Sequence, residues 1–144
     1  MAELRPKIVK LAKMVGGIAG AMNKIDENAP EYYALDCVVS DEQADVALVM
    51  GLRKPRTLEY VQQHSGKDPE LTKKLLMELV QIGVAKRWHE DGQELFWVNI
   101  FAPGMLEMMV NNREQLEAHP QIGKAFEEYT RKRLAPMAAM FPEG

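Results

Sequence analysis

The segment that most restricts the fold of this chain runs from Thr57 to Phe101. It holds a short apolar-periodic stretch at 58–64, a Ser-Gly-Lys-Asp turn, and a longer periodic stretch at 69–82. Two stretches rich in strand formers follow at 84–89 and 94–100, and the Asp-Gly pair between them is a strong signal for a β-hairpin. Helix, turn, helix and hairpin in this order predict a winged helix-turn-helix.

Capping residues define the bounds of the two helices. Thr57 and Asp68 have the side chains preferred before a helix, and Pro69 stands at a first position, where its missing N–H is no loss. Gly83 predicts the end of the second helix. Helical spacing predicts a core stripe on this helix: Leu71, Leu75, Leu76, Leu79, Val80 and Ile82. The outward side is then predicted to carry Glu70, Lys73, Lys74, Met77 and Gln81.

The flanking segments predict further helices. A basic amphipathic helix is expected at 4–22, packed on its own domain or on a twin subunit, with a membrane surface as the alternative. Another helix is expected after Ser40, up to Gly51. Residues 28–35, with the Tyr32-Tyr33 pair, are expected to form a loop, and residues 53–56 a short basic linker. Helices at 105–118 and 121–134 complete the prediction.

The predicted fold class is therefore mainly α with a small β-hairpin. A winged helix-turn-helix core is flanked by an N-terminal helix and two C-terminal helices. The expected organisation is an N-terminal helix and linker at 1–29, a winged-helix domain at 30–104 and a helical extension at 105–144.

Composition and charge limit the classes of function that this chain can have. The net charge of −3 lacks the basic surplus typical of dedicated nucleic-acid binders. Cys37 is the single cysteine, so no disulfide can form within the chain, and we expect it to be a small buried apolar residue. No apolar run is long enough to span a bilayer and no signal-peptide core is visible, which predicts a cytoplasmic protein without a membrane span.

No catalytic or metal-binding residue is predicted. The three histidines are scattered, and the glycines at 16–20 follow no strand and precede no Lys-Ser pair, so they do not match a nucleotide loop. Binding therefore remains, to DNA or to protein. The second helix of the helix-turn-helix begins with Asp68 and Glu70, which would face DNA phosphates. DNA binding is the alternative hypothesis, with phosphate contacts expected from Lys73, Lys74, Lys86 and Arg87.

Methionines indicate a protein partner. Methionine is flexible and polarisable, and it suits irregular partner surfaces. We expect Met109 to lie in the core. The predicted partner-binding residues are Met77, Met105, Met108, Met137, Met140 and Phe141.

Three stretches carry a family resemblance: PEYYALDCVVSDEQADVALVMGLRKPRT, ELFWVNIFAPGMLEMMVNN and HPQIGKAFEEYTRKRLAPMAAMFPEG. With them the chain resembles, from about Pro30 to Gly144, the N-terminal winged-helix-like region of iron–sulfur and FAD-dependent pyridine nucleotide oxidoreductases of anaerobic microbes. The resemblance implies [4Fe–4S] clusters and FAD only in a larger parent protein, since the cluster cysteines of that family are absent here. It further implies a non-catalytic scaffolding role, with redox domains or subunits, or a second copy in a homodimer, as partners.

Overall fold

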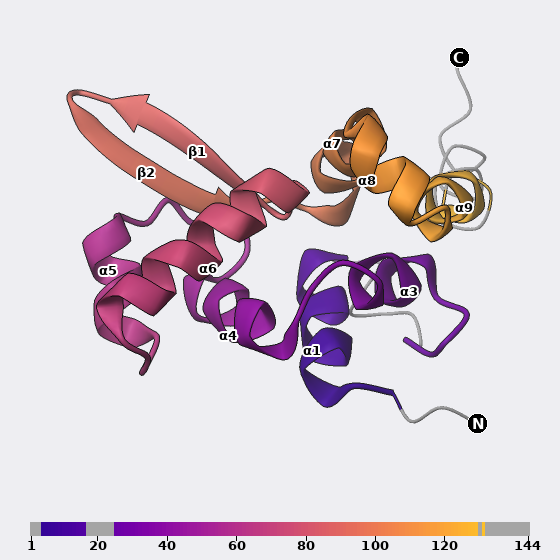
Figure 1. Cartoon of the computed structure of the whole chain (residues 1–144), viewed down its shortest axis with the longest axis horizontal. Helices are drawn as coiled ribbons and strands as arrows, with labels where there is room; N and C mark the ends of the chain where they lie inside the picture. The colour runs from indigo at the N-terminus through magenta and orange to yellow at the C-terminus, as the bar shows by residue number, and fades with distance from the viewer. Residues whose placement is uncertain (1–3, 17–24, 130, 132–144) are drawn as a thin grey trace, which may run out of the picture.

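A computed structural model of the chain describes residues 4–16, 25–129 and 131. The fold is mainly helical with one two-stranded antiparallel sheet, as predicted (Figure 1). The elements are α1 (Pro6–Val15), α3 (Pro30–Asp36), α4 (Asp41–Met50), α5 (Leu58–His64), α6 (Pro69–Ile82), β1 (Ala85–Glu90), β2 (Gln93–Val98), the π-helical turn η1 (Phe101–Met105), α7 (Leu106–Asn111), α8 (Arg113–Ala118) and α9 (Gln121–Tyr129).

The helix starts predicted from capping residues are confirmed for α4, α5 and α6. The Ser40 hydroxyl accepts the Gln43 N–H and the Gln43 side chain accepts the Ser40 N–H, which completes a capping box. Asp68 accepts two N–H groups in the first turn of α6. A hydrogen bond that the sequence did not indicate also stabilises the turn before α6. Thr72 is buried, and its hydroxyl oxygen lies 2.7 Å from that of Ser65.

The hairpin forms at the predicted turn. Asp91 and Gly92 both have positive φ, 51° and 75°, which is the backbone that a two-residue type I′ turn requires. The second edge of β2 is covered by the preceding chain, because Arg56 and Phe96 exchange two backbone hydrogen bonds of 2.7 Å. Arg53 adds a third such bond, to the Val98 carbonyl. Residues 53–56 connect α4 and α5 as the short basic linker that we predicted, and backbone hydrogen bonds at Arg53 and Arg56 hold both of its ends against β2.

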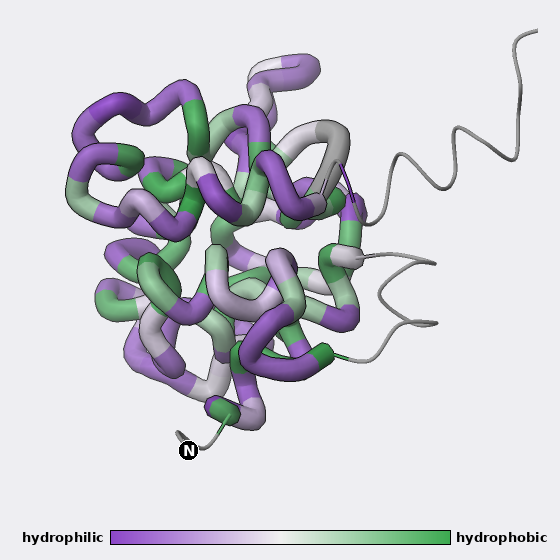
Figure 2. Tube along the Cα trace, turned by 90° about the vertical axis from the view of Figure 1, so that its right-hand side faces the viewer, coloured by the Kyte–Doolittle hydropathy of each residue, from purple (hydrophilic) through white to green (hydrophobic). Residues whose placement is uncertain are grey.

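One hydrophobic core connects the N-terminal and C-terminal helices with the central segment. Its largest buried side chains come from elements throughout the chain, among them Leu11, Leu35, Leu76, Phe96 and Phe101. α1 packs on α3 and α4, while α9 packs on α3 and α7. Hydrophobic and hydrophilic residues alternate along the chain in Figure 2, which suits elements that each bury one side.

The expected loop at 28–35 is wrong, since most of it belongs to α3. Pro30 occupies the first position of this helix and Glu31 its first turn, the same start signal as at Pro69. Tyr32 is buried, and its hydroxyl accepts the N–H of Arg5 at 2.9 Å. A seven-residue helix offers little periodicity, and packing against α1 and α9 stabilises it instead.

The single helix expected at 105–118 is also wrong. Asn112 leaves the helical region, with φ −81° and ψ 94°, and its side chain accepts the Gln115 N–H to start α8. α1 is described over Pro6–Val15 and α9 over Gln121–Tyr129, and both lie within the predicted helices. The remainders of those predictions, at 17–22, 130 and 132–134, lie outside the described residues.

Gly83 fixes where α7 meets α6. It ends α6 with φ 105°, a left-handed conformation that favours glycine. A Cβ atom at this position would lie 3.2 Å from the Cβ of Met108 and 3.4 Å from the backbone nitrogen of Met109. The predicted C-cap therefore has a second role, the close approach of α7.

Candidate interaction surface

The hairpin presents an aromatic face away from the core. In its register Lys86 pairs with Trp97, and Trp88 with Leu95. Because side chains alternate along a strand, these four lie on the face opposite to the buried Phe96 and Val98. We call them the outer face of the hairpin: Lys86, Trp88, Leu95 and Trp97, bordered by Arg53 and Pro55.

The outer face is exposed and slightly hollowed. Trp88 is 52% exposed, the largest exposure among the bulky hydrophobic side chains of the described residues. Two shallow depressions of about 350 and 410 Å³ lie on this face, and both are lined by Arg53 and Trp97. The Lys86 ammonium lies 5.8 Å from the centre of the Trp97 ring, a cation–π distance. The surface thus offers flat apolar area beside positive charge.

Arg53 is held at this surface by its backbone. Its φ of 56° is uncommon for a residue with a side chain, and the hydrogen bond from its N–H to the Val98 carbonyl at 2.9 Å maintains it. The side chain of Arg53 therefore extends from a backbone position that is fixed beside β2.

On the opposite face of the hairpin, near its tip, the charged side chains pair with one another. Arg87 lies 2.7 Å from the Glu94 carboxylate, and His89 lies 3.3 Å from it. The hydrogen bond from Arg87 lowers the pKa of Glu94, which keeps the carboxylate charged. Arg87 and Lys86, both predicted as phosphate contacts, consequently face opposite sides of the sheet.

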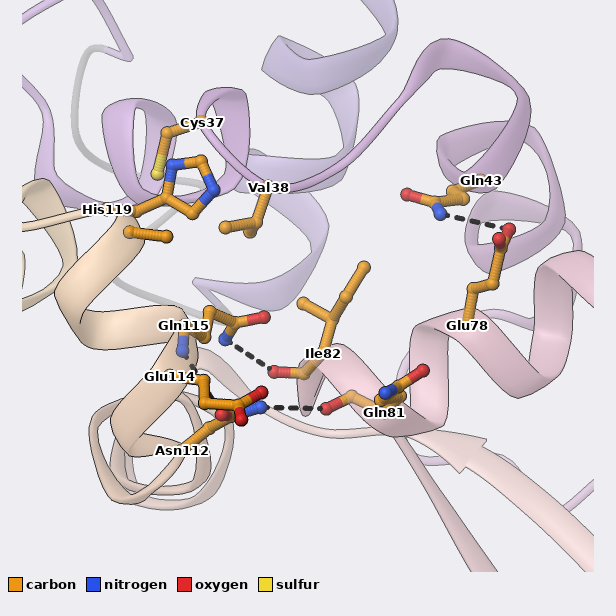
Figure 3. A pocket seen from close by; sticks show the side chains of 11 residues that line it. Cys37, Val38, Gln43, Glu78, Gln81, Ile82, Asn112, Glu114, Gln115 and His119 are labelled. Carbon is orange, nitrogen blue, oxygen red and sulfur yellow. Dashed lines mark hydrogen bonds between the residues drawn. The ribbon is translucent and has the colours of Figure 1, made fainter.

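A third hollow, of about 430 Å³, lies between the end of α6 and α8 (Figure 3). Its polar groups complete the fold: the Gln115 amide donates to the Ile82 carbonyl at 3.0 Å, and the Asn112 amide to the Gln81 carbonyl at 3.5 Å. These are carbonyls at a helix C-terminus, which lack partners within the helix. Asn112 and Gln115 therefore cap the C-terminal end of α6 at this hollow.

Cys37 lines this hollow, and its thiol is protonated at neutral pH. Burial raises the pKa of its thiol to about 11, and the sulfur lies 3.1 Å from the Ala34 carbonyl oxygen. The residue is half-buried rather than fully buried.

The predicted partner-binding methionines are not gathered in one place. Met105 is fully buried, so its assignment to an exposed surface is wrong, while Met109 is buried as predicted. Met77 is half-buried against the core, and Leu71, placed in the core stripe, is 36% exposed instead. Met108 is 38% exposed, with its sulfur 3.4 Å from the Asn99 amide nitrogen. The remaining three predictions lie outside the described residues: Met137, Met140 and Phe141.

The lysines of the DNA hypothesis are exposed. Lys73 and Lys74 lie on the outer side of α6, and neither forms a salt bridge with another described residue. Lys86 is exposed on the outer face of the hairpin, next to Trp97.

Sequence reasoning missed Trp88, Leu95 and Trp97. A signal was present, since Trp88 alternates with charged neighbours along one strand and Trp97 pairs with Lys86 on the next. Large aromatic side chains on the solvent-facing side of a hairpin are not needed to build the hydrophobic core.

Within the parts of the chain that the structure describes, no group of three or more His, Cys, Asp or Glu side chains is placed to hold a metal ion. No helix there has the length and apolar character needed to cross a membrane. Comparisons with protein families, curated proteins and solved structures found no match to this chain. The functional argument therefore rests on the surface itself.

Proposed function

We propose that this chain is a non-catalytic interaction and scaffolding domain that docks a partner protein on the outer face of the hairpin. The observation that carries the proposal is the exposure of Trp88 beside Leu95 and Trp97. Exposed aromatic side chains bordered by arginine are characteristic of the energetic centres of protein interfaces, because they bury much area and order few rotatable bonds.

The charge distribution favours a protein over a nucleic acid as the partner. Glu90 and Asp91 at the hairpin tip and Asp68 and Glu70 at the start of α6 are exposed carboxylates, which would repel phosphates. Glu94 pairs with Arg87. A protein surface with apolar side chains and a few carboxylates would complement the tryptophans, Arg53 and Lys86.

We further propose a redox enzyme as the setting. The order α4, α5, α6 and hairpin, with Arg56 paired to β2 where a short third strand would stand, supports a winged-helix interpretation. The resemblance from about Pro30 to Gly144 then supports docking to domains or subunits of an iron–sulfur or flavin oxidoreductase of an anaerobe. The [4Fe–4S] clusters and FAD would belong to those partners.

The native polypeptide, isolated without oxygen, tests this setting through its intact mass and its visible absorbance. A larger coloured product is expected, and a colourless chain of 16.3 kDa with no associated protein would reject the setting. Docking is tested with tagged Trp88→Ser, using Leu71→Ser as the control, because Leu71 is an exposed apolar residue on α6. Wild type and the control should retain the coloured partner and Trp88→Ser should lose it. Equal retention by all three would contradict docking on the outer face.

A second candidate function is DNA binding, which the unpaired exposed Lys73 and Lys74 favour. It predicts duplex binding that weakens steeply with salt, and a smaller salt dependence after both are changed to alanine. Trp88→Ser should then have little effect. Undetectable duplex binding at low salt would remove this candidate.

A further inference from the structure

The outer strand of the hairpin has an edge without a backbone partner. β2 lies between β1 and α5, so β1 is the outer strand (Figure 1). Phe96 directs its N–H and C=O groups to Arg56, away from β1. Its partner in the register, Arg87, therefore directs its own backbone groups away from β2, and His89, two residues further, does the same. No described residue hydrogen-bonds to these groups.

This edge combines two features that proteins usually avoid together. Residues 86–90 are all exposed, and the middle one is Trp88. An accessible strand edge with unpaired N–H and C=O groups is a template for another strand. The charged neighbours of Trp88 are of opposite sign, Lys86 on one side and Glu90 on the other.

We propose that a second copy of this chain pairs antiparallel with β1 along this edge, on a twofold axis through Trp88. The inference rests on the proposed function and supplies one partner for it. In this register Trp88 lies opposite Trp88 of the second copy. Lys86 lies opposite Glu90 of the second copy, and the symmetry repeats this pair on the other side of the axis. The result is a continuous four-stranded sheet with Trp88 of both copies on one face.

The backbone supports this register. The hydrogen-bonded pairs become Arg87 with His89 of the second copy and the reverse, which are the residues whose groups point outward. Trp88 and the Lys86–Glu90 pairs then occupy the non-hydrogen-bonded positions, where side chains are closest.

Neighbouring registers lack this complementarity. An axis through Arg87 places its guanidinium opposite itself, and an axis through His89 separates both Lys86–Glu90 pairs. Axes through Lys86 or Glu90 place like charges opposite each other. On the opposite face of the sheet, Glu94 of each chain already pairs with Arg87 and His89 of the same chain. Charge complementarity thus selects one register.

A charge-reversal cycle tests the interface by sedimentation equilibrium of the full chain. Wild type should show a concentration-dependent dimer. Glu90→Lys and Lys86→Glu should each raise the dimer dissociation constant by about tenfold or more, since each places like charges opposite each other twice. The double variant Lys86→Glu with Glu90→Lys should return close to wild type. Circular dichroism checks the fold of each variant.

Cross-linking tests the register in a chain that carries Cys37→Ala. Adding Trp88→Cys should give a disulfide-linked dimer on oxidation, because the residue lies opposite itself. Adding Lys86→Cys instead is the control. Its two copies would be separated along the strands by four residues, about 13 Å, and should not cross-link.

A monomer at all concentrations would overturn the inference, as would a dimer indifferent to the charge reversals. Cross-linking through position 86 instead of 88 would overturn the register. Quenching of tryptophan fluorescence by an oligonucleotide without dimer formation would assign the face to nucleic acid instead. A monomer that still retains a partner protein through Trp88 would refute the second copy and leave the proposed function standing, whereas a monomer retaining none would refute both.

Discussion

The Cys37 thiol shows how burial controls the chemistry of a single side chain here. Its pKa is raised from 9.0 to about 11, first by burial and also by the nearby Asp36 charge. At neutral pH the thiolate is then about a hundredfold scarcer than in a free thiol of the ordinary pKa. We predict that iodoacetamide alkylates Cys37 of the folded protein at least tenfold more slowly than it alkylates the unfolded chain at about pH 8.

Mass spectrometry over time measures this rate, and a chain with Cys37→Ala and Glu42→Cys provides the control. Glu42 is an exposed residue in the first turn of α4, where the helix N-terminus lowers the pKa of a thiol, so a cysteine there should react at least as fast as a free thiol does. Equal rates at positions 37 and 42 would show that burial does not suppress the thiolate.

Two glycines near helix ends allow the cost of backbone strain to be measured separately from the cost of crowding. Gly83 and Gly66 both have positive φ, 105° and 72°, but of the two only Gly83 has atoms within 4 Å of the place that an alanine methyl group would occupy. We predict that Gly66→Ala costs about 1 kcal/mol of unfolding free energy from backbone strain alone. Gly83→Ala should cost about 1–3 kcal/mol more, because its new methyl group meets Met108 and the backbone of α7. Urea unfolding measures both, and equal losses would contradict the close approach of α7 to Gly83.

The elements that the sequence predicted well are those with local signals at both ends. α4, α5, α6 and the hairpin carry caps or turn residues whose hydrogen bonds are made within four residues, so no distant contact was needed to locate them. α3 was missed although Pro30 marks its start, because its stability comes from α1 and α9. The break at Asn112 was missed because its side chain could equally have lain on a helix surface.

The candidate surface was predicted less well than the fold for the same reason. Helical spacing cannot distinguish Met77 from Leu71, because both lie near the boundary between the buried and exposed sides, and the packing of neighbouring elements decides which is covered. Met105 is the last residue of η1 and is fully buried, because the turn places it in the core and not on a helix surface. The exposed face of Trp88 depends on the register of β1 and β2 together with the pairing of Arg53 and Arg56 to β2.

Across the whole molecule, Asp45 connects segments that are distant in sequence. Its carboxylate lies 3.0 Å from the Lys7 ammonium on α1 and 3.1 Å from that of Lys67 in the turn before α6. The side chain is 28% exposed, so water screens these contacts only in part. Burial works against ionisation of Asp45, but the hydrogen bonds from Lys7 and Lys67 outweigh it and lower its pKa below the ordinary 3.8.

This arrangement predicts a pH-dependent loss of stability in Asp45→Asn. A carboxylate whose folded pKa is depressed stabilises the fold fully above its unfolded pKa, and the contribution disappears as the pH falls through the folded value. The variant should therefore be less stable than wild type by about 0.5–1 kcal/mol near pH 7. The difference should shrink below pH 3.8 and vanish once Asp45 is protonated in both states. Glu27→Gln, in an exposed turn outside the helices, removes one negative charge and should leave stability almost unchanged. Thermal unfolding across this pH range decides the matter, since a difference that persists in acid would assign the role of Asp45 to packing and not to its charge.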